Sequence, residues 1–268
     1  MATSLRTALT DARASAIPHT QGHPSAPGVW ALGRIEARRM LLHPSFLIAT
    51  AFGLFLIRGL AGTMGGGFDL AETLAWLVGG ALIGVFVGTV LTANVAALRQ
   101  HRDHTQELFG ALPAPPESRT ASVFVGLLLG PVAFSVVLTV MASWAFRIND
   151  DMAASMDLFL AVQVPLTVFA LGAIGIAVGR WVPTLLGGPV VIALHVFTGV
   201  IWAVPWIQDT GSGIDRPRHM LYLVAAITMW TALAFARDRR TPVRFAIAAA
   251  AFVLGVVMAI QQAPLGGY

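Results

Sequence analysis

Two histidines with neighbouring carboxylates form the densest group of titratable side chains in this sequence. His101 and His104 are three residues apart, and Asp103 and Glu107 stand beside them. A metal site needs three or four ligands in a defined geometry, and Arg99 adds repulsive positive charge to this group. We therefore predict a solvated helix face without a metal, in which Arg99 pairs with Asp103 across one helical turn.

Three polar side chains interrupt long apolar segments, where a polar group is costly and marks a functional candidate. They are Asn94, Gln163 and His195. Each is expected either to contact a substrate or a proton or to hydrogen-bond a neighbouring helix, and the second role is the commoner one. No carboxylate lies in the middle of an apolar segment, which argues against a proton pump with a carboxylate relay.

The absence of lysine excludes one kind of catalytic site. All 17 basic residues other than histidine are arginine. A phosphate-binding P-loop requires Gly-x-x-x-x-Gly-Lys-Ser/Thr, because the lysine reaches the β- and γ-phosphates. No other catalytic set converges in the sequence, so we expect no enzyme, and any nucleotide hydrolysis must be supplied by another polypeptide.

The composition sets the class of protein. The 268 residues are 56% hydrophobic and only 11% charged, with a mean hydropathy of +0.75, whereas soluble domains carry about 25% charged residues. Several apolar segments reach the roughly 20 residues that a spanning helix needs. We predict an all-α polytopic membrane helix bundle in a lipid bilayer. The net charge of +4 comes from arginines at helix ends, so no nucleic-acid partner is expected.

The apolar segments give six core spans and a seventh segment that could also cross the bilayer. Residues 1–27 are expected to be a disordered cytoplasmic tail, 28–240 a transmembrane domain, and 241–268 an additional C-terminal hydrophobic segment. The expected spans are approximately 44–62, 69–98, 121–146, 158–178, 185–206 and 219–236, and the seventh apolar run is 243–260.

Local sequence features refine these spans. Pro131, Pro165 and Pro189 interrupt three of them and predict kinks that packing accommodates. Gly84 and Gly88 are four residues apart, a spacing that lets helices approach closely. We favour close packing inside one subunit, with a seam between two subunits as the alternative.

A short helix is predicted ahead of the first span. It contains Glu36, Arg38 and Arg39, and Glu36 can pair with Arg39 at a spacing of three residues. We expect this helix to lie at the cytoplasmic interface, where its arginines meet lipid phosphates.

The arginines also predict the orientation. With the N-terminus inside, only Arg58, Arg147, Arg216 and Arg218 lie outside, and the other 13 of the 17 arginines are cytoplasmic. The reversed orientation inverts this count, and basic residues in short loops favour the cytoplasmic side. The polar stretch RQHRDHTQELFGALPAPPESRTAS, residues 99–122, is therefore expected to be cytoplasmic.

The sequence RIEARRMLLHPSFLIATAFGLFL, then a second span, then TANVAALRQHRDHTQELFGALPAPPESRTASVFVGLLL, resembles the membrane subunit of a type-2 ABC exporter. In that family an interfacial helix with a glutamate and arginines precedes the first span. A short coupling helix that ends in a motif like E-L-x-x-A-L-P follows the second. The resemblance covers approximately residues 30–240. Its interfacial helix corresponds to Glu36, Arg38 and Arg39, and its coupling motif to Glu107, Leu108, Ala111, Leu112 and Pro113, followed by Arg119 before the third span. We expect Arg102 and Phe109 to take part in the same coupling to the ATPase.

This resemblance implies a permease in the cell membrane with a cytoplasmic N-terminus. A separate ATP-binding subunit would carry ATP and Mg²⁺, and this chain would bind no cofactor. A second permease chain, identical or related, would complete the pathway. The cargo would be amphipathic or lipid-like, such as an antibiotic, and export would proceed by alternating access.

The side chains of the predicted coupling helix agree with such a role. Leu108, Phe109 and Leu112 form one apolar surface flanked by charges, as in a helix that docks into a groove on a partner. Pro113, Pro115 and Pro116 are expected to end this helix and stiffen the return to the third span. An ordinary loop with a chance apolar cluster is the alternative.

Two other functions remain open from the sequence. A membrane scaffold or sensor subunit could hold a partner through the same segment without transporting anything. An ATP-independent secondary transporter would be favoured by inverted repeats, and none is clear. The seventh apolar run also departs from the six spans that are usual for the family.

Overall fold

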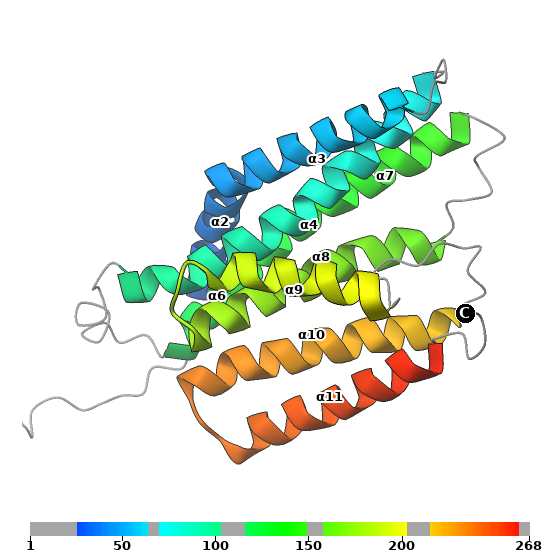
Figure 1. Cartoon of the computed structure of the whole chain (residues 1–268). Helices are drawn as coiled ribbons and strands as arrows, with labels where there is room; N and C mark the ends of the chain where they lie inside the picture. The colour runs from blue at the N-terminus through cyan, green and yellow to red at the C-terminus, as the bar shows by residue number, and fades with distance from the viewer. Residues whose placement is uncertain (1–25, 64–69, 103–115, 149–157, 203–214, 263–268) are drawn as a thin grey trace, which may run out of the picture.

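The computed structural model describes residues 26–63, 70–102, 116–148, 158–202 and 215–262, and every element in these ranges is a helix (Figure 1). The helices are α2 (Ala26–Leu41), α3 (Pro44–Thr63), α4 (Leu70–Arg102), α6 (Pro116–Leu127), the π-helical turn η1 (Leu128–Val132), α7 (Ala133–Ile148), α8 (Leu158–Trp181), α9 (Gly187–Trp202), α10 (Arg216–Asp238) and α11 (Pro242–Gln262).

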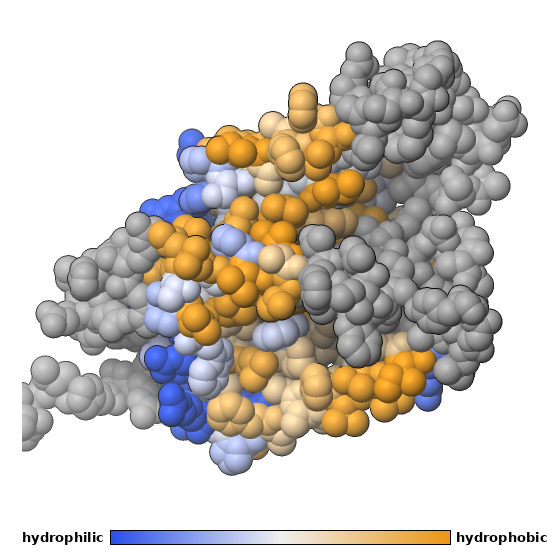
Figure 2. Space-filling view, in the orientation of Figure 1, coloured by the Kyte–Doolittle hydropathy of each residue, from blue (hydrophilic) through white to orange (hydrophobic). Residues whose placement is uncertain are grey.

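Five stretches of these helices are long and apolar enough to cross a membrane. They are Val78–Arg99, Pro116–Trp144, Ala161–Trp181, Arg216–Asp238 and Pro242–Gln261. The pair Pro27–Leu41 and Pro44–Leu56, bent by 46°, adds a sixth when it is counted as one broken span. Apolar side chains also cover much of the visible surface (Figure 2). The chain is therefore a helical membrane protein, as its composition predicts.

One end of the bundle is rich in arginine among the described residues. We call the end where α4, α8 and α10 finish and α6 and α11 begin the basic end, because it holds arginines 99, 119, 180, 237 and 244. Hydrophilic side chains gather at this end in the space-filling view (Figure 2). The helix α11 runs antiparallel to α10, packs chiefly against it, and finishes at the opposite end (Figure 1).

Helix α4 is central because glycines let its neighbours approach to backbone contact. It packs against α3, α7, α8 and α9. A Cβ added at Gly84 would lie 2.4 Å from the carbonyl oxygen of Ala49 on α3, and one at Gly175 of α8 would lie 2.6 Å from the carbonyl oxygen of Val90. Gly88 likewise faces Phe46 of α3. The predicted close packing within one subunit is present on this side of α4.

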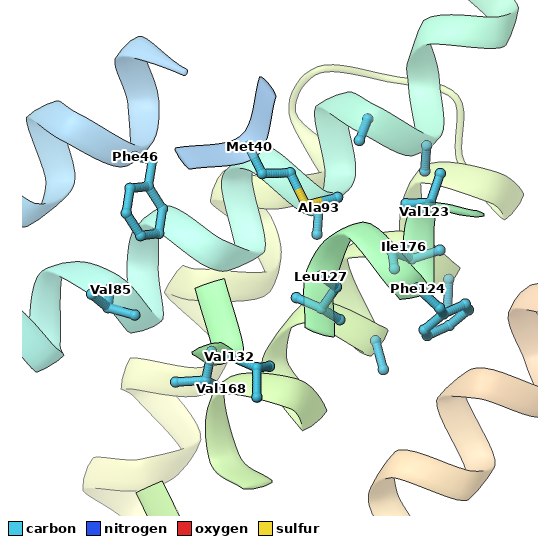
Figure 3. Packing of buried hydrophobic residues seen from close by; sticks show 14 of the residues in the cluster. Met40, Phe46, Val85, Ala93, Val123, Phe124, Leu127, Val132, Val168 and Ile176 are labelled. Atoms are coloured by element: carbon cyan, nitrogen blue, oxygen red, sulfur yellow. The ribbon is translucent and has the colours of Figure 1, made fainter. Parts of the chain in front are cut away.

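The apolar core lies between α4 and the helices packed around it. Figure 3 shows Met40, Phe46, Val85, Leu127 and Val168 converging from five helices, α2, α3, α4, α6 and α8. Met40 and Leu127 are fully enclosed, although they come from the short helix α2 and from the last residue of α6. Helix α2 is thus part of the packed bundle as well as a candidate interfacial helix.

The prolines behave in three different ways. Pro131 lies in the π-helical turn η1, which joins α6 to α7, so the α-helical hydrogen-bond pattern is interrupted at this proline. Pro165 lies inside α8, which continues on both sides. The prediction for Pro189 is wrong, because α9 begins at Gly187 and places this proline in the first turn, where no N–H is needed.

The third span begins earlier than the sequence predicted. We expected it to start near Ala121, but α6 begins at Pro116. A proline is favourable in the first turn of a helix, and Glu117 there complements the helix dipole. Pro116 therefore belongs to the first turn of the third span. Helix α4 also continues to Arg102, beyond the predicted end at residue 98.

A substitution at Gly84 tests the backbone contact between α3 and α4. We expect Gly84→Ala to lower the free energy of unfolding by about 1–3 kcal/mol, because the methyl group would meet backbone atoms of α3 that cannot move independently. Gly79 is the matched control on the same helix, since a Cβ there meets nothing within 4 Å. Thermal unfolding of both variants in detergent checks this, and equal melting temperatures would contradict it.

Candidate functional site

A glutamate on α2 joins that helix to the end of α4. Arg99 donates hydrogen bonds from Nη1 to Glu36 Oε1 at 2.9 Å and Oε2 at 2.8 Å, and Arg39 donates to Oε1 at 3.1 Å. The predicted Glu36–Arg39 pair is confirmed. The guanidinium of Arg99 reaches the carboxylate of Glu36, 63 residues away in sequence. Its predicted partner Asp103 lies outside the described residues, so that pairing stays a prediction.

Close helix packing explains why Glu36 can reach α4. A Cβ added at Gly126 of α6 would lie 2.7 Å from the Cβ of Glu36, and one at Gly130 would lie 3.1 Å from the carbonyl oxygen of Ala37. The short distance between α2 and α6 leaves the Glu36 side chain only 15% exposed, against 29% for Arg99. Reduced exposure strengthens this charge-assisted contact relative to a surface pair.

A second ionic contact joins three other helices at the basic end. Arg180, near the end of α8, forms an ion pair with Asp238, the last residue of α10, and their side chains are 10% and 1% exposed. Thr120 of α6 donates to the other carboxylate oxygen of Asp238 at 2.5 Å. One buried carboxylate therefore connects α6, α8 and α10.

A third contact adds α11 to this group. Arg244 donates from Nη2 to Glu117 Oε1 at 3.4 Å, and its guanidinium carbon lies 5.9 Å from the centre of the Phe235 ring. Arg237 of α10 donates from Nε to the carbonyl oxygen of Arg180 at 3.3 Å. The end of α10 therefore contacts α6 and α8, and the start of α11 contacts α6.

These contacts flank the segment that the sequence singled out for coupling. Residues 103–115 separate α4 from α6. On one side, Arg99 holds the end of α4 to α2; on the other, Thr120 and Glu117 hold the start of α6 to α10 and α11. A force applied between residues 102 and 116 would therefore act on two groups of helices that are each held together by ionic contacts.

The coupling residues themselves lie mostly outside the described part of the chain. Arg102 is the last residue of α4, and its side chain is not among those described. The others fall in 103–115 and are Glu107, Leu108, Phe109, Ala111, Leu112 and Pro113. Their proposed arrangement on a short helix remains a prediction.

Asn94 is used for helix packing. It is 1% exposed and donates from Nδ2 to the carbonyl oxygen of Gly175 on α8 at 3.4 Å. Cβ atoms added at Gly179 and Gly187 would lie 3.1 Å and 3.2 Å from the same Nδ2 atom. Glycines of α8 and α9 therefore lie close to the side-chain amide of Asn94. Of the two roles expected for Asn94, the structure shows the hydrogen bond to a neighbouring helix.

Gln163 also contacts a neighbouring helix, with a partner that the sequence reasoning missed. Its Nε2 lies 2.9 Å from Nε2 of His219 on α10, and both residues are fully buried. Gly175, which binds Asn94, lies 12 residues farther along α8, a separation of about 18 Å. His195 belongs to α9, and its side chain is outside those described. Asn94 and Gln163 therefore do not form one polar site.

The connection of Arg180, Asp238 and Thr120 was not predicted from the sequence. The available signal was Asp238 in the stretch ARDRR, an isolated carboxylate between arginines at the end of an apolar segment. Such a residue needs a cation wherever it is buried, but the sequence alone does not say which arginine supplies it.

Replacing the buried carboxylate tests its structural role. We expect Asp238→Asn to destabilise the protein by about 3–5 kcal/mol, because Arg180 then remains buried beside a neutral group. Asp215→Asn at the other end of α10 is the control, where asparagine can still cap the helix and the pair with Arg218 is exposed, so the cost is below about 1 kcal/mol. Thermal unfolding in detergent checks the ranking, and a reversed order would refute it.

Comparison of the chain with models of known protein families and with curated proteins finds no match.

Proposed function

We propose that the chain is the transmembrane permease subunit of an ATP-driven exporter of the type-2 ABC class. The observation that carries the proposal is the arrangement around residues 103–115. Glu36 and Arg99 hold α2 to the end of α4, and Asp238 holds the start of α6 to α8 and α10. This segment therefore joins two anchored groups of helices, which is what a coupling element between an ATPase and a permease requires.

In the proposed mechanism the ATPase acts on residues 103–115, which we call the junction. A separate ATPase subunit, which carries ATP and Mg²⁺, docks on the apolar surface of Leu108, Phe109 and Leu112. When two ATPase subunits close, the junction moves and tilts α4 relative to α6. The rigid contacts at the basic end transmit this motion along the spans, and the pathway between two permease chains opens alternately to each side.

The basic end faces the cytoplasm in this proposal, and the membrane is the cell membrane. Arginines concentrate at that end, and basic residues in short connections favour the cytoplasmic side. Helix α2 then begins on the cytoplasmic side. Helix α11 carries the chain across to the outside, because α11 runs away from the basic end.

The cargo class follows from the apolar character of the spans. Amphipathic or lipid-like molecules, including antibiotics, suit helices whose polar groups are few and engaged between helices, as Asn94 and Gln163 are. His195 is the remaining candidate for contact with cargo. The principal rival is a scaffold or sensor subunit that binds a partner through residues 103–115 without transport.

The coupling surface is tested by the double substitution Phe109→Asp and Leu112→Asp. Burying each of these side chains against a partner stabilises a complex by about 1.5–3 kcal/mol. We therefore expect the double variant to bind the ATPase about a hundredfold more weakly. Co-purification of the ATPase and ATP-dependent export are the measurements.

Thr105→Asp with Gln106→Asp is the matched control, because it adds the same charges to the same segment without removing an apolar anchor. Wild-type co-purification and export in the Phe109/Leu112 variant would refute the coupling role. Loss of ATPase binding in the variant, combined with no export by the wild-type complex, would favour the scaffold.

The orientation is tested by single cysteines, since the chain contains none. With the proposed orientation, a membrane-impermeant maleimide should label Ser155→Cys and Gly267→Cys in intact cells. It should label Thr105→Cys only after the membrane is permeabilised. The reverse pattern at residues 105 and 155 would overturn the orientation, and protection of residue 267 would remove α11 from the spanning helices.

A further inference from the structure

An open pocket of about 700 Å³ lies between α2 and the start of α3 at the basic end. It combines three guanidinium groups and an imidazole with apolar side chains. The residues that line it are Ile35, Arg38, Arg39, Leu42, His43, Pro44 and Arg99.

The pocket carries an excess of positive charge. Arg39 and Arg99 share the single carboxylate of Glu36. Arg38 is exposed, and within the described residues it has no ion-pair partner. Three cations against one anion favour a ligand that brings negative charge.

His43 can also bind a negatively charged ligand, as a neutral hydrogen-bond donor. Its Nδ1 accepts a hydrogen bond from the backbone N–H of Ser45 at 3.2 Å, which leaves Nε2 as the nitrogen that carries the proton. Burial lowers the pKa of His43, and the neighbouring charge of Arg99 lowers it further. Both effects favour the neutral imidazole, which still offers an N–H.

An apolar surface continues from this pocket along α3. Leu47 and Ile48, one turn beyond Pro44, are exposed, and so are Phe52 and Phe55 farther along the same helix. A small inorganic anion would gain nothing from these side chains. An amphiphile with a charged head and hydrocarbon tails would contact both the arginines and this surface.

We propose that this pocket binds the headgroup of an anionic phospholipid, with its phosphate on Arg38 and Arg99 and its acyl chains along α3. Guanidinium groups bind phosphate oxygens in a bidentate manner, and basic residues at a membrane surface favour anionic lipids. The site depends only on the described residues of one chain and does not rest on the exporter proposal.

The test is native mass spectrometry of the full chain in detergent, with equimolar phosphatidylglycerol and phosphatidylcholine added. We expect the wild-type protein to retain phosphatidylglycerol selectively and Arg38→Gln to lower that selective retention about fivefold. Arg34→Gln is the matched control, because Arg34 is an exposed arginine of the same helix and does not line the pocket. It should retain the lipid as the wild type does, and the melting temperature of each variant without lipid reports whether it is folded.

The other outcomes overturn the proposal. Equal losses in both variants would mean diffuse attraction to the helix, and unchanged retention in a folded Arg38→Gln variant would assign the pocket to another occupant. Equal retention of the two lipids by the wild type would remove the role of charge. Displacement of phosphatidylglycerol by millimolar inorganic phosphate would make the pocket a site for soluble anions.

Discussion

A carboxylate withdrawn from water into a helix bundle must find its cation and its hydrogen bonds inside the protein. Asp238 meets this constraint with Arg180 on one oxygen and Thr120 on the other, and in doing so fixes the relative positions of α10, α8 and α6. Arg244 and Glu117 extend the same connection to α11. Because Asp238 and Arg180 are buried and cannot be separated cheaply, they hold α6, α8 and α10 together at the basic end, and the more exposed pair of Arg244 and Glu117 adds a weaker contact with α11.

The hydrophobic effect does not drive spanning helices together, because lipid tails are as apolar as their side chains. Close packing therefore has to stabilise the bundle along its length. The structure meets this with backbone contacts, as where Gly84 meets Ala49 and Gly175 meets Val90. Polar side chains are used sparingly and satisfied across helices, as by Asn94 on the carbonyl oxygen of Gly175. Packing thus sets the spacing of the spans, and the ionic contacts at the basic end set their register.

The helices could be predicted from the sequence because hydropathy is a local property. The limits of α3 and α10 differ from the predicted ones by only a few residues, since apolar runs and charged ends define them. The ionic contacts could not be predicted, because Glu36 and Arg99, or Thr120 and Asp238, are brought together only by the packing of distant helices. The start of the third span was placed five residues too late, because proline is as favourable at the start of a helix as it is disruptive within one.

Arg99 links the two proposals made for the basic end. Its guanidinium binds Glu36 and at the same time lines the pocket between α2 and α3. A phosphate in that pocket would bind the same guanidinium group that holds α2 to α4. Arg99 lies only a few residues before the junction at 103–115. A guanidinium has five N–H donors, so it can serve a carboxylate and a phosphate together, and then both anions would hold the end of α4 in one place. Helix α2 with an anionic lipid beside it would therefore act as the fixed support against which the junction moves.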